Sequence, residues 1–110
     1  MLSFLERNKY KSVKANDMEN LLGKVDLIDI RDSNEYANGH IPTAKNIPME
    51  KLLGNTAEWL DKNKQYYIVC QTGGRSSKTC SKLFSEGYNV VNVEGGTGSY
   101  IKSLEMTENK

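Results

Sequence analysis

Three apolar segments, each short enough to be a buried strand, alternate with segments of helical spacing, and this alternation restricts the chain to few architectures. The apolar segments are residues 25–30, 66–69 and 89–93. Strands that follow one another through helical crossovers run parallel, and a parallel sheet needs cover on both faces. The pattern therefore predicts an α/β fold with a mostly parallel central sheet and helices on both faces.

Four helices are expected around these strands. Three of them begin with an N-cap residue and a glutamate three positions later: Asn16 with Glu19, Asp32 with Glu35, and Asn55 with Glu58. The longest is expected over residues 76–86, because Cys80, Leu83 and Phe84 form one apolar stripe and Gly87 follows in the stop position.

The chain has 110 residues, of which 37% are hydrophobic and 26% charged. This size and composition predict one domain over residues 1–110, with a core from about residue 10 to about residue 104. The last residues, 107–110, are expected to fray.

Charge and hydropathy exclude several classes of partner. Fifteen Lys and Arg against fourteen Asp and Glu give a net charge of +1, which provides no field for nucleic acid or an anionic membrane. The longest apolar run, residues 66–70, is far shorter than the about 20 residues of a membrane span. The first seven residues lack the apolar stretch of a secretory signal, so we expect a cytoplasmic protein.

The chemistry is expected where the second apolar segment ends at Cys70. Gln71, Thr72, Gly73, Gly74 and Arg75 follow and lead into the helix that contains Ser76. Glycines let successive backbone N–H groups curl toward the sulfur, and the helix start adds partial positive charge. The loop is therefore expected to lower the pKa of Cys70 and make it a nucleophilic thiolate.

Two simpler interpretations of these residues fit the sequence less well. A strand-end cysteine is often a small buried hydrophobe, but such a residue does not need two glycines and an arginine directly after it. Arg75 is an unfavourable charge at a helix start, so we expect it to close the loop or contact an anion.

Two blocks of sequence closely resemble the rhodanese-like domain family. The first, residues 26–48, contains an acidic and arginine pair, E-Y, and G-H-I-P-T-A-K-N-I-P; the second, residues 68–96, reads I-V-C-Q-T-G-G-R-S-S through to G-Y, a strand and G-G. The resemblance implies a sulfurtransferase without cofactor or metal, in which Cys70 takes sulfane sulfur from thiosulfate or a related small anionic donor. The resulting persulfide would pass its sulfur to a thiol or cyanide-type acceptor.

Two other functions stay open at this point. One is a sulfur-relay module that exchanges sulfur with a partner protein and has little activity on thiosulfate. The other is a cysteine-based phosphatase or arsenate reductase. Related phosphatases have a longer loop, whereas only four residues separate Cys70 from Arg75, so the cradle should fit one extra sulfur better than a phosphate.

Three further residues are expected to support the site without reacting. Asp29 and Arg31 lie on the same side of a strand end, so they are expected to pair and brace the loop. His40, the only histidine, is expected to be a hydrogen-bonded turn residue, because a preformed thiolate needs no general base.

Cys80 is expected to fill the core. With one histidine and no C-x-x-C pair, a structural metal site is not expected.

Overall fold

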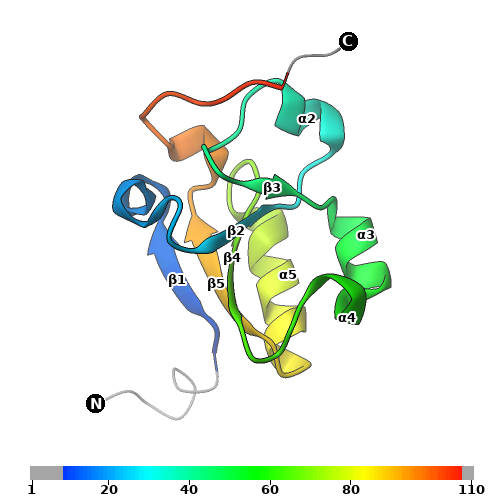
Figure 1. The fold of residues 1–110 in the computed structure, drawn as a ribbon. Coiled ribbons are helices and arrows are strands. Elements are labelled where there is room, and N and C mark those ends of the chain that lie inside the picture. Colours follow the sequence, from blue (N-terminus) through cyan, green and yellow to red (C-terminus); the bar gives the residue numbers. More distant parts are fainter. Residues whose placement is uncertain (1–8, 108–110) are drawn as a thin grey trace, which may run out of the picture.

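The computed structural model describes residues 9–107, in which five parallel strands form one sheet. The order across the sheet is β1–β5–β4–β2–β3 (Figure 1). The strands are β1 (Lys11–Lys14), β2 (Asp26–Asp29), β3 (Lys45–Asn46), β4 (Gln65–Val69) and β5 (Asn89–Glu94). Every pairing between neighbouring strands is parallel, as the alternating pattern predicts.

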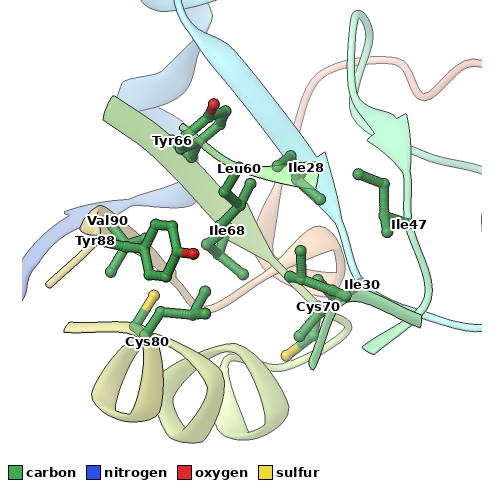
Figure 2. Packing of buried hydrophobic residues seen from close by; sticks show 12 residues of the cluster. Ile28, Ile30, Ile47, Leu60, Tyr66, Ile68, Cys70, Cys80, Tyr88 and Val90 are labelled. Atoms are coloured by element: carbon green, nitrogen blue, oxygen red, sulfur yellow. The ribbon is translucent and has the colours of Figure 1, made fainter. Parts of the chain in front are cut away.

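Helices cover both faces of this sheet. The 3₁₀ helices η1 (Ala15–Leu21) and η2 (Thr97–Ser99) are short, and the α-helices are α2 (Ser33–Ala37), α3 (Met49–Gly54), α4 (Thr56–Trp59) and α5 (Gly74–Ser85). Leu52 of α3 and Leu83 of α5 pack with Ile28 and Ile68 in one core cluster (Figure 2). Met18 of η1 packs with Val69 in a second cluster on the opposite face. The fold class predicted from the sequence is therefore confirmed.

Strand alternation decides which side chains reach which face. Ile28 and Ile30 belong to the first cluster together with Cys70, whereas Leu27 belongs to the second together with Val69. Because successive residues of a strand point to opposite faces, Cys70 points toward the side of α5. Asp29 and Arg31 continue the register of Leu27 and point to the other side.

Several expected elements differ from the structure. The helix expected after Asn16 is a 3₁₀ helix capped by Lys14, and Asn16 instead accepts a hydrogen bond from the amide of Ile101 through Oδ1 (2.9 Å). The longest helix begins at Gly74, two residues before the expected start. β1, β3 and α3 were not predicted, because they are short or exposed and carry no apolar run.

The C-terminal segment is held against the rest of the domain. Glu105 and His40 exchange backbone hydrogen bonds of 2.9 Å, and the amide of Thr107 donates to the carbonyl of Ala37 (3.0 Å). Figure 1 shows this segment, coloured red, passing α2. Thr107, the first of the residues expected to fray, thus has a backbone hydrogen bond in the structure. Residues 108–110 lie outside the described residues. So does segment 1–7, on which the expectation of no secretory signal rests.

Within residues 9–107, no helix has the length and apolar character needed to cross a bilayer.

Candidate active site

The site forms where three neighbouring strands end at the same edge of the sheet. In the parallel register Asp29 of β2 lies beside Val69 of β4, so the residues that follow these strands emerge together. Cys70 follows β4, and the glycine pair Gly95 and Gly96 follows β5. The carboxyl edge of a parallel sheet is where such folds place their ligands.

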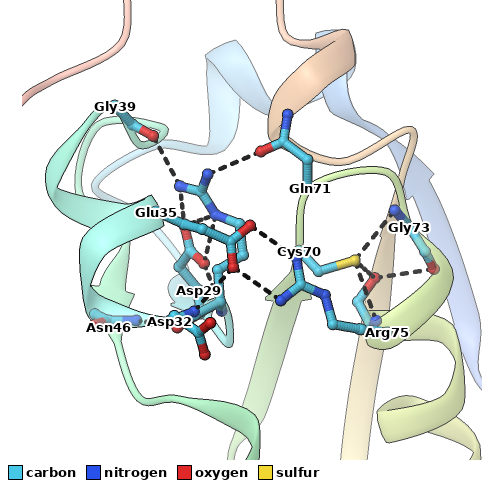
Figure 3. Close-up of polar contacts among 11 residues, drawn as sticks. Asp29, Asp32, Glu35, Gly39, Asn46, Cys70, Gln71, Gly73 and Arg75 are labelled. Carbon is cyan, nitrogen blue, oxygen red and sulfur yellow. Dashed lines mark hydrogen bonds and ion pairs between the residues drawn. The ribbon is translucent and has the colours of Figure 1, made fainter.

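Backbone amides of the loop point at the Cys70 sulfur (Figure 3). The N–H of Gly73 donates to Sγ at 3.1 Å and the N–H of Ser76 donates at 3.3 Å. Gly73 has φ of 102°, a left-handed conformation that glycine adopts without strain and that turns its amide toward the sulfur. The thiol is free, and the residue is only 1% exposed.

The hydroxyl of Ser76 completes the ring of polar groups around the sulfur. Its Oγ lies 3.4 Å from Cys70 Sγ and 3.2 Å from the carbonyl oxygen of Gly73. A protonated thiol donates to this oxygen while the hydroxyl donates to Gly73. When the thiol loses its proton, the hydroxyl can turn and donate to the sulfur instead.

These contacts govern the pKa of Cys70. Burial raises the pKa, but hydrogen bonds from the Ser76 hydroxyl and from the amides of Ser76, Gly73 and Thr72 together outweigh burial. The net result is a pKa below that of an ordinary thiol. A lower pKa increases the fraction of thiolate, which is the form of cysteine that reacts as a nucleophile.

Replacement of Ser76 by alanine should raise the pKa of Cys70. A hydrogen bond to a charged group contributes about 1.5–3 kcal/mol, so the alkylation rate at a pH below the thiol pKa should fall by about ten- to a hundredfold. The whole rate profile should move to higher pH, because the thiolate is then lost at a higher pH. Iodoacetamide kinetics against pH measure this, with the exposed Ser81→Ala on the same helix as the control. Superimposable profiles for Ser76→Ala and the wild type would contradict the assignment.

Arg75 does not contact the sulfur through any hydrogen bond. Its two terminal nitrogens donate to the two carboxylate oxygens of Glu35, each at 3.0 Å (Figure 3). This pairing raises the pKa of Arg75 and lowers that of Glu35. Glu35 was predicted only as part of a helix start, and it does close the capping box of α2 by accepting from the Asp32 amide. Its second contact joins segments 40 residues apart and had no signal in the local sequence.

Asp29 and Arg31 form a buried ion pair behind the loop. Arg31 donates from Nε to both oxygens of Asp29 and from a terminal nitrogen to one of them at 2.8 Å. The remaining contacts of Arg31 reach the Gly39 carbonyl (2.8 Å) and Oε1 of Gln71 (2.9 Å). The pair therefore touches the loop through Gln71 and lies on the opposite face from the thiol.

His40 is held by the end of α2. Its Nδ1 lies 2.8 Å from the carbonyl oxygen of Tyr36, and its ring stacks on the Tyr36 ring with centroids 3.7 Å apart. These contacts orient the imidazole toward Tyr36, and the hydrogen bond of its Nδ1 is made with α2 and not with the Cys70 sulfur.

We expect His40→Gln to keep turnover in the sulfur transfer that the resemblance implies within about threefold of the wild type, because loss of a general base would cost about 10²–10⁴-fold. The measurement is turnover per folded molecule, with the folded fraction taken from circular dichroism. A loss of two orders of magnitude in a folded variant would make His40 a catalytic base.

The β5–η2 turn closes the site from a third side. The amides of Thr97 and Gly98 donate to the carbonyls of Cys70 and Gln71, both at 2.9 Å. A side chain at Gly96 would bring its Cβ within 2.4 Å of the Cys70 carbonyl oxygen. Of the glycine pair visible in the sequence, Gly96 is thus required for the backbone to approach the loop this closely.

A surface pocket of about 420 Å³ lies beside the loop. Its lining comes from the loop, α2, η2 and the C-terminal segment: Arg31, Glu35, Asn38, Gly39, Gln71, Thr97, Gly98, Tyr100 and Leu104. Thr72 and Gly74 are exposed at the surface of the loop. The pocket therefore offers room for a small molecule beside the loop.

Cys80 belongs to the core. It is fully buried in the cluster under α5, and burial raises its pKa to about 12. Figure 2 shows Cys70 where β4 ends and Cys80 further along the helix. The prediction of a core-filling cysteine is confirmed. Within residues 9–107, no cluster of three or more His, Cys, Asp or Glu side chains is arranged to hold a metal ion.

A parallel α/β domain with a strand-end thiol facing loop amides defines a class of cysteine-dependent group-transfer proteins. Residues 14–103 match the family described as Rhodanese-like domain. The chain belongs to this family, as the two sequence blocks predicted.

Similar proteins agree with the assignment. The putative sulfurtransferase YtwF of Bacillus subtilis is 44% identical over 70 residues, which are 64% of this chain and 67% of that protein. The putative sulfur carrier protein YrkF of the same species is 32% identical over 82 residues, 74% of this chain but only 44% of YrkF. The crystal structure of a rhodanese-like domain protein from Staphylococcus aureus has a TM-score of 0.75 and 37% identity, covering 89% of this chain and 99% of that one. Sulfur transfer is the general chemistry that these relatives support.

Proposed function

We propose that this protein is a sulfurtransferase that carries sulfane sulfur as a persulfide on Cys70. The observation that carries the proposal is the pair of amides, from Gly73 and Ser76, that donate to the Cys70 sulfur at 3.1 and 3.3 Å. Donors arranged in this way stabilise negative charge without reorganising during the reaction.

The reaction takes place in two displacements. The Cys70 thiolate attacks the outer sulfur of a donor such as thiosulfate, the donor S–S bond breaks, and sulfite leaves with the bonding electron pair. The outer sulfur of the new persulfide is anionic and occupies the cradle formed by residues 71–76. A thiol or cyanide acceptor then attacks that sulfur, and the Cys70 thiolate leaves with the electron pair of the broken bond.

The supporting residues have separate tasks in this proposal. Gln71 through Ser76 shape the cradle, and Arg75, the one cation among them, lies at its opening in the ion pair with Glu35. Asp29 and Arg31 hold the loop through Gln71, whereas His40 fixes the end of α2. No metal or cofactor takes part in either displacement.

A sulfur-relay module with little activity on thiosulfate is the second candidate. The observation that favours it is the ion pair between Arg75 and Glu35, which occupies the one cation of the loop. Such a module takes its sulfur from a persulfide on a partner protein and uses the same Cys70 chemistry.

Sulfite release before any acceptor is added tests the proposal. Mixed with excess thiosulfate alone, the protein should release a single sulfite per chain in a burst and then stop, and cyanide should restart turnover with formation of thiocyanate. Loading by an alkyl persulfide, but not by thiosulfate, would select the relay module. No loading by either donor would refute sulfur transfer at this site.

A further inference from the structure

Arg75 is the only charged residue between Cys70 and Ser76, and its positive charge is paired with the carboxylate of Glu35. Both terminal nitrogens of the guanidinium bond the two carboxylate oxygens, which is the strongest arrangement for this type of pair. Both side chains remain about one third exposed, at 37% and 35%, so the pair lies at the opening of the site. Because its charge is offset by the carboxylate, a guanidinium held in this way attracts a second anion only weakly.

The other cation beside the loop is also neutralised. Arg31 is 3% exposed and spends its charge on the buried carboxylate of Asp29. Asp32, at the start of α2, adds a further carboxylate whose charge is felt by Arg75. Among the described residues around the loop and pocket, two guanidinium groups therefore face three carboxylates, before the Cys70 thiolate itself is counted.

Thiosulfate is a dianion and must approach this thiolate. The approach brings like charges together in a partly buried site where both guanidinium groups described beside the loop are already paired and do not offset the repulsion. A donor with one negative charge fewer meets a smaller barrier. The charge at the opening of the site thus discriminates between donors that deliver the same sulfur.

From this arrangement we infer that Glu35 sets the donor specificity of the site by holding Arg75, so that sulfur donors of low charge are favoured over small dianions. Glu35 is a positioning residue that acts through Arg75. The inference rests on the proposed function, because it concerns the donor of the Cys70 persulfide.

Two nearly isosteric donors isolate this effect. Methanethiosulfonate carries one negative charge and thiosulfate carries two. With methanethiosulfonate the Cys70 thiolate attacks the terminal sulfur, the S–S bond breaks, and methanesulfinate leaves with the electron pair. Both reactions leave the same persulfide on Cys70, so a different response to one substitution reports the charge of the donor.

Glu35→Gln is the informative substitution. The amide oxygen of glutamine can still accept the hydrogen bond from the Asp32 amide, so the capping box of α2 is retained. The negative charge and one of the two acceptor oxygens are lost, so the guanidinium of Arg75 keeps at most one of its two hydrogen bonds to residue 35 and becomes available to the donor. We expect the KM for thiosulfate to fall about fivefold and the KM for methanethiosulfonate about twofold, with kcat almost unchanged for both.

Two further variants serve as controls. Glu86→Gln removes a carboxylate from the ion pair with Lys82 at the far end of α5, and it should change neither KM. The double variant Glu35→Gln with Arg75→Gln should lose the gain for thiosulfate, because the gain requires the freed guanidinium.

Steady-state thiocyanate formation with both donors gives the result. Equal changes in the two KM values, no change in either, or a gain that persists in the double variant would overturn the role of Glu35. Persulfide on Cys70 after methanethiosulfonate treatment of the wild type, seen by intact-mass spectrometry, tests the proposed function separately. Absence of persulfide after treatment with methanethiosulfonate and also after treatment with an alkyl persulfide would refute sulfur transfer, whereas persulfide formation with unchanged specificity in Glu35→Gln would refute only this inference.

Discussion

Cys70→Ser is expected to lower thiocyanate formation by about a thousandfold or more, because the persulfide cannot form on a serine hydroxyl. Serine is nearly isosteric with cysteine, and its hydroxyl oxygen can accept hydrogen bonds from the amides of Gly73 and Ser76. The fold should therefore persist while the chemistry is lost. The measurement is kcat/KM with thiosulfate or methanethiosulfonate as donor.

Cys80→Ala is the matched control, since it removes the other buried thiol of the same core cluster. It should cost stability through the loss of a buried side chain but retain turnover in the folded fraction. Residual turnover in Cys70→Ser comparable to the wild type would show that another group carries the sulfur.

Asp29→Ala is expected to lower the free energy of unfolding by about 3–5 kcal/mol, because it leaves the buried guanidinium of Arg31 without its carboxylate. The contacts of Arg31 with Gln71 and Gly39 do not replace that charge. Urea unfolding measures the change. Turnover per folded molecule should fall much less than stability, since the pair lies on the opposite face from the thiol.

Two variants keep this prediction testable. Asp29→Asn retains hydrogen-bond acceptors and should unfold at an intermediate urea concentration, which is informative if Asp29→Ala does not fold. Glu19→Ala removes an exposed ion pair with Lys102 and should cost at most about 1 kcal/mol. A normal unfolding midpoint for Asp29→Ala, combined with lost turnover, would contradict a bracing role.

The parts of the fold that could be predicted are those whose own residues bear the signal. β2, β4 and β5 are buried on both faces and therefore appear as apolar runs, and α5 has an apolar stripe of helical spacing. β1 has the sequence KSVK and is largely exposed, whereas β3 consists of two residues. Their strand conformation comes from pairing with a neighbour, which no local pattern records.

The same limit applies to the site. The cradle is built from consecutive residues, so the order cysteine, loop, glycines and helix start was enough to expect amides around the sulfur. The partner of Arg75 comes from α2, 40 residues earlier, and is brought there only when the sheet assembles. Asn16 shows the opposite case. Its side chain was expected to cap a helix from local sequence alone, but it instead accepts a hydrogen bond from the distant amide of Ile101.

Intact-mass spectrometry of the protein after treatment with a sulfane-sulfur donor tests the central claim most directly. The wild type is expected to gain one sulfur atom per chain and to lose it again with dithiothreitol, whereas Cys70→Ser is expected to gain none. A wild-type chain that stays unmodified, or a Cys70→Ser chain that gains the same sulfur, would contradict that claim.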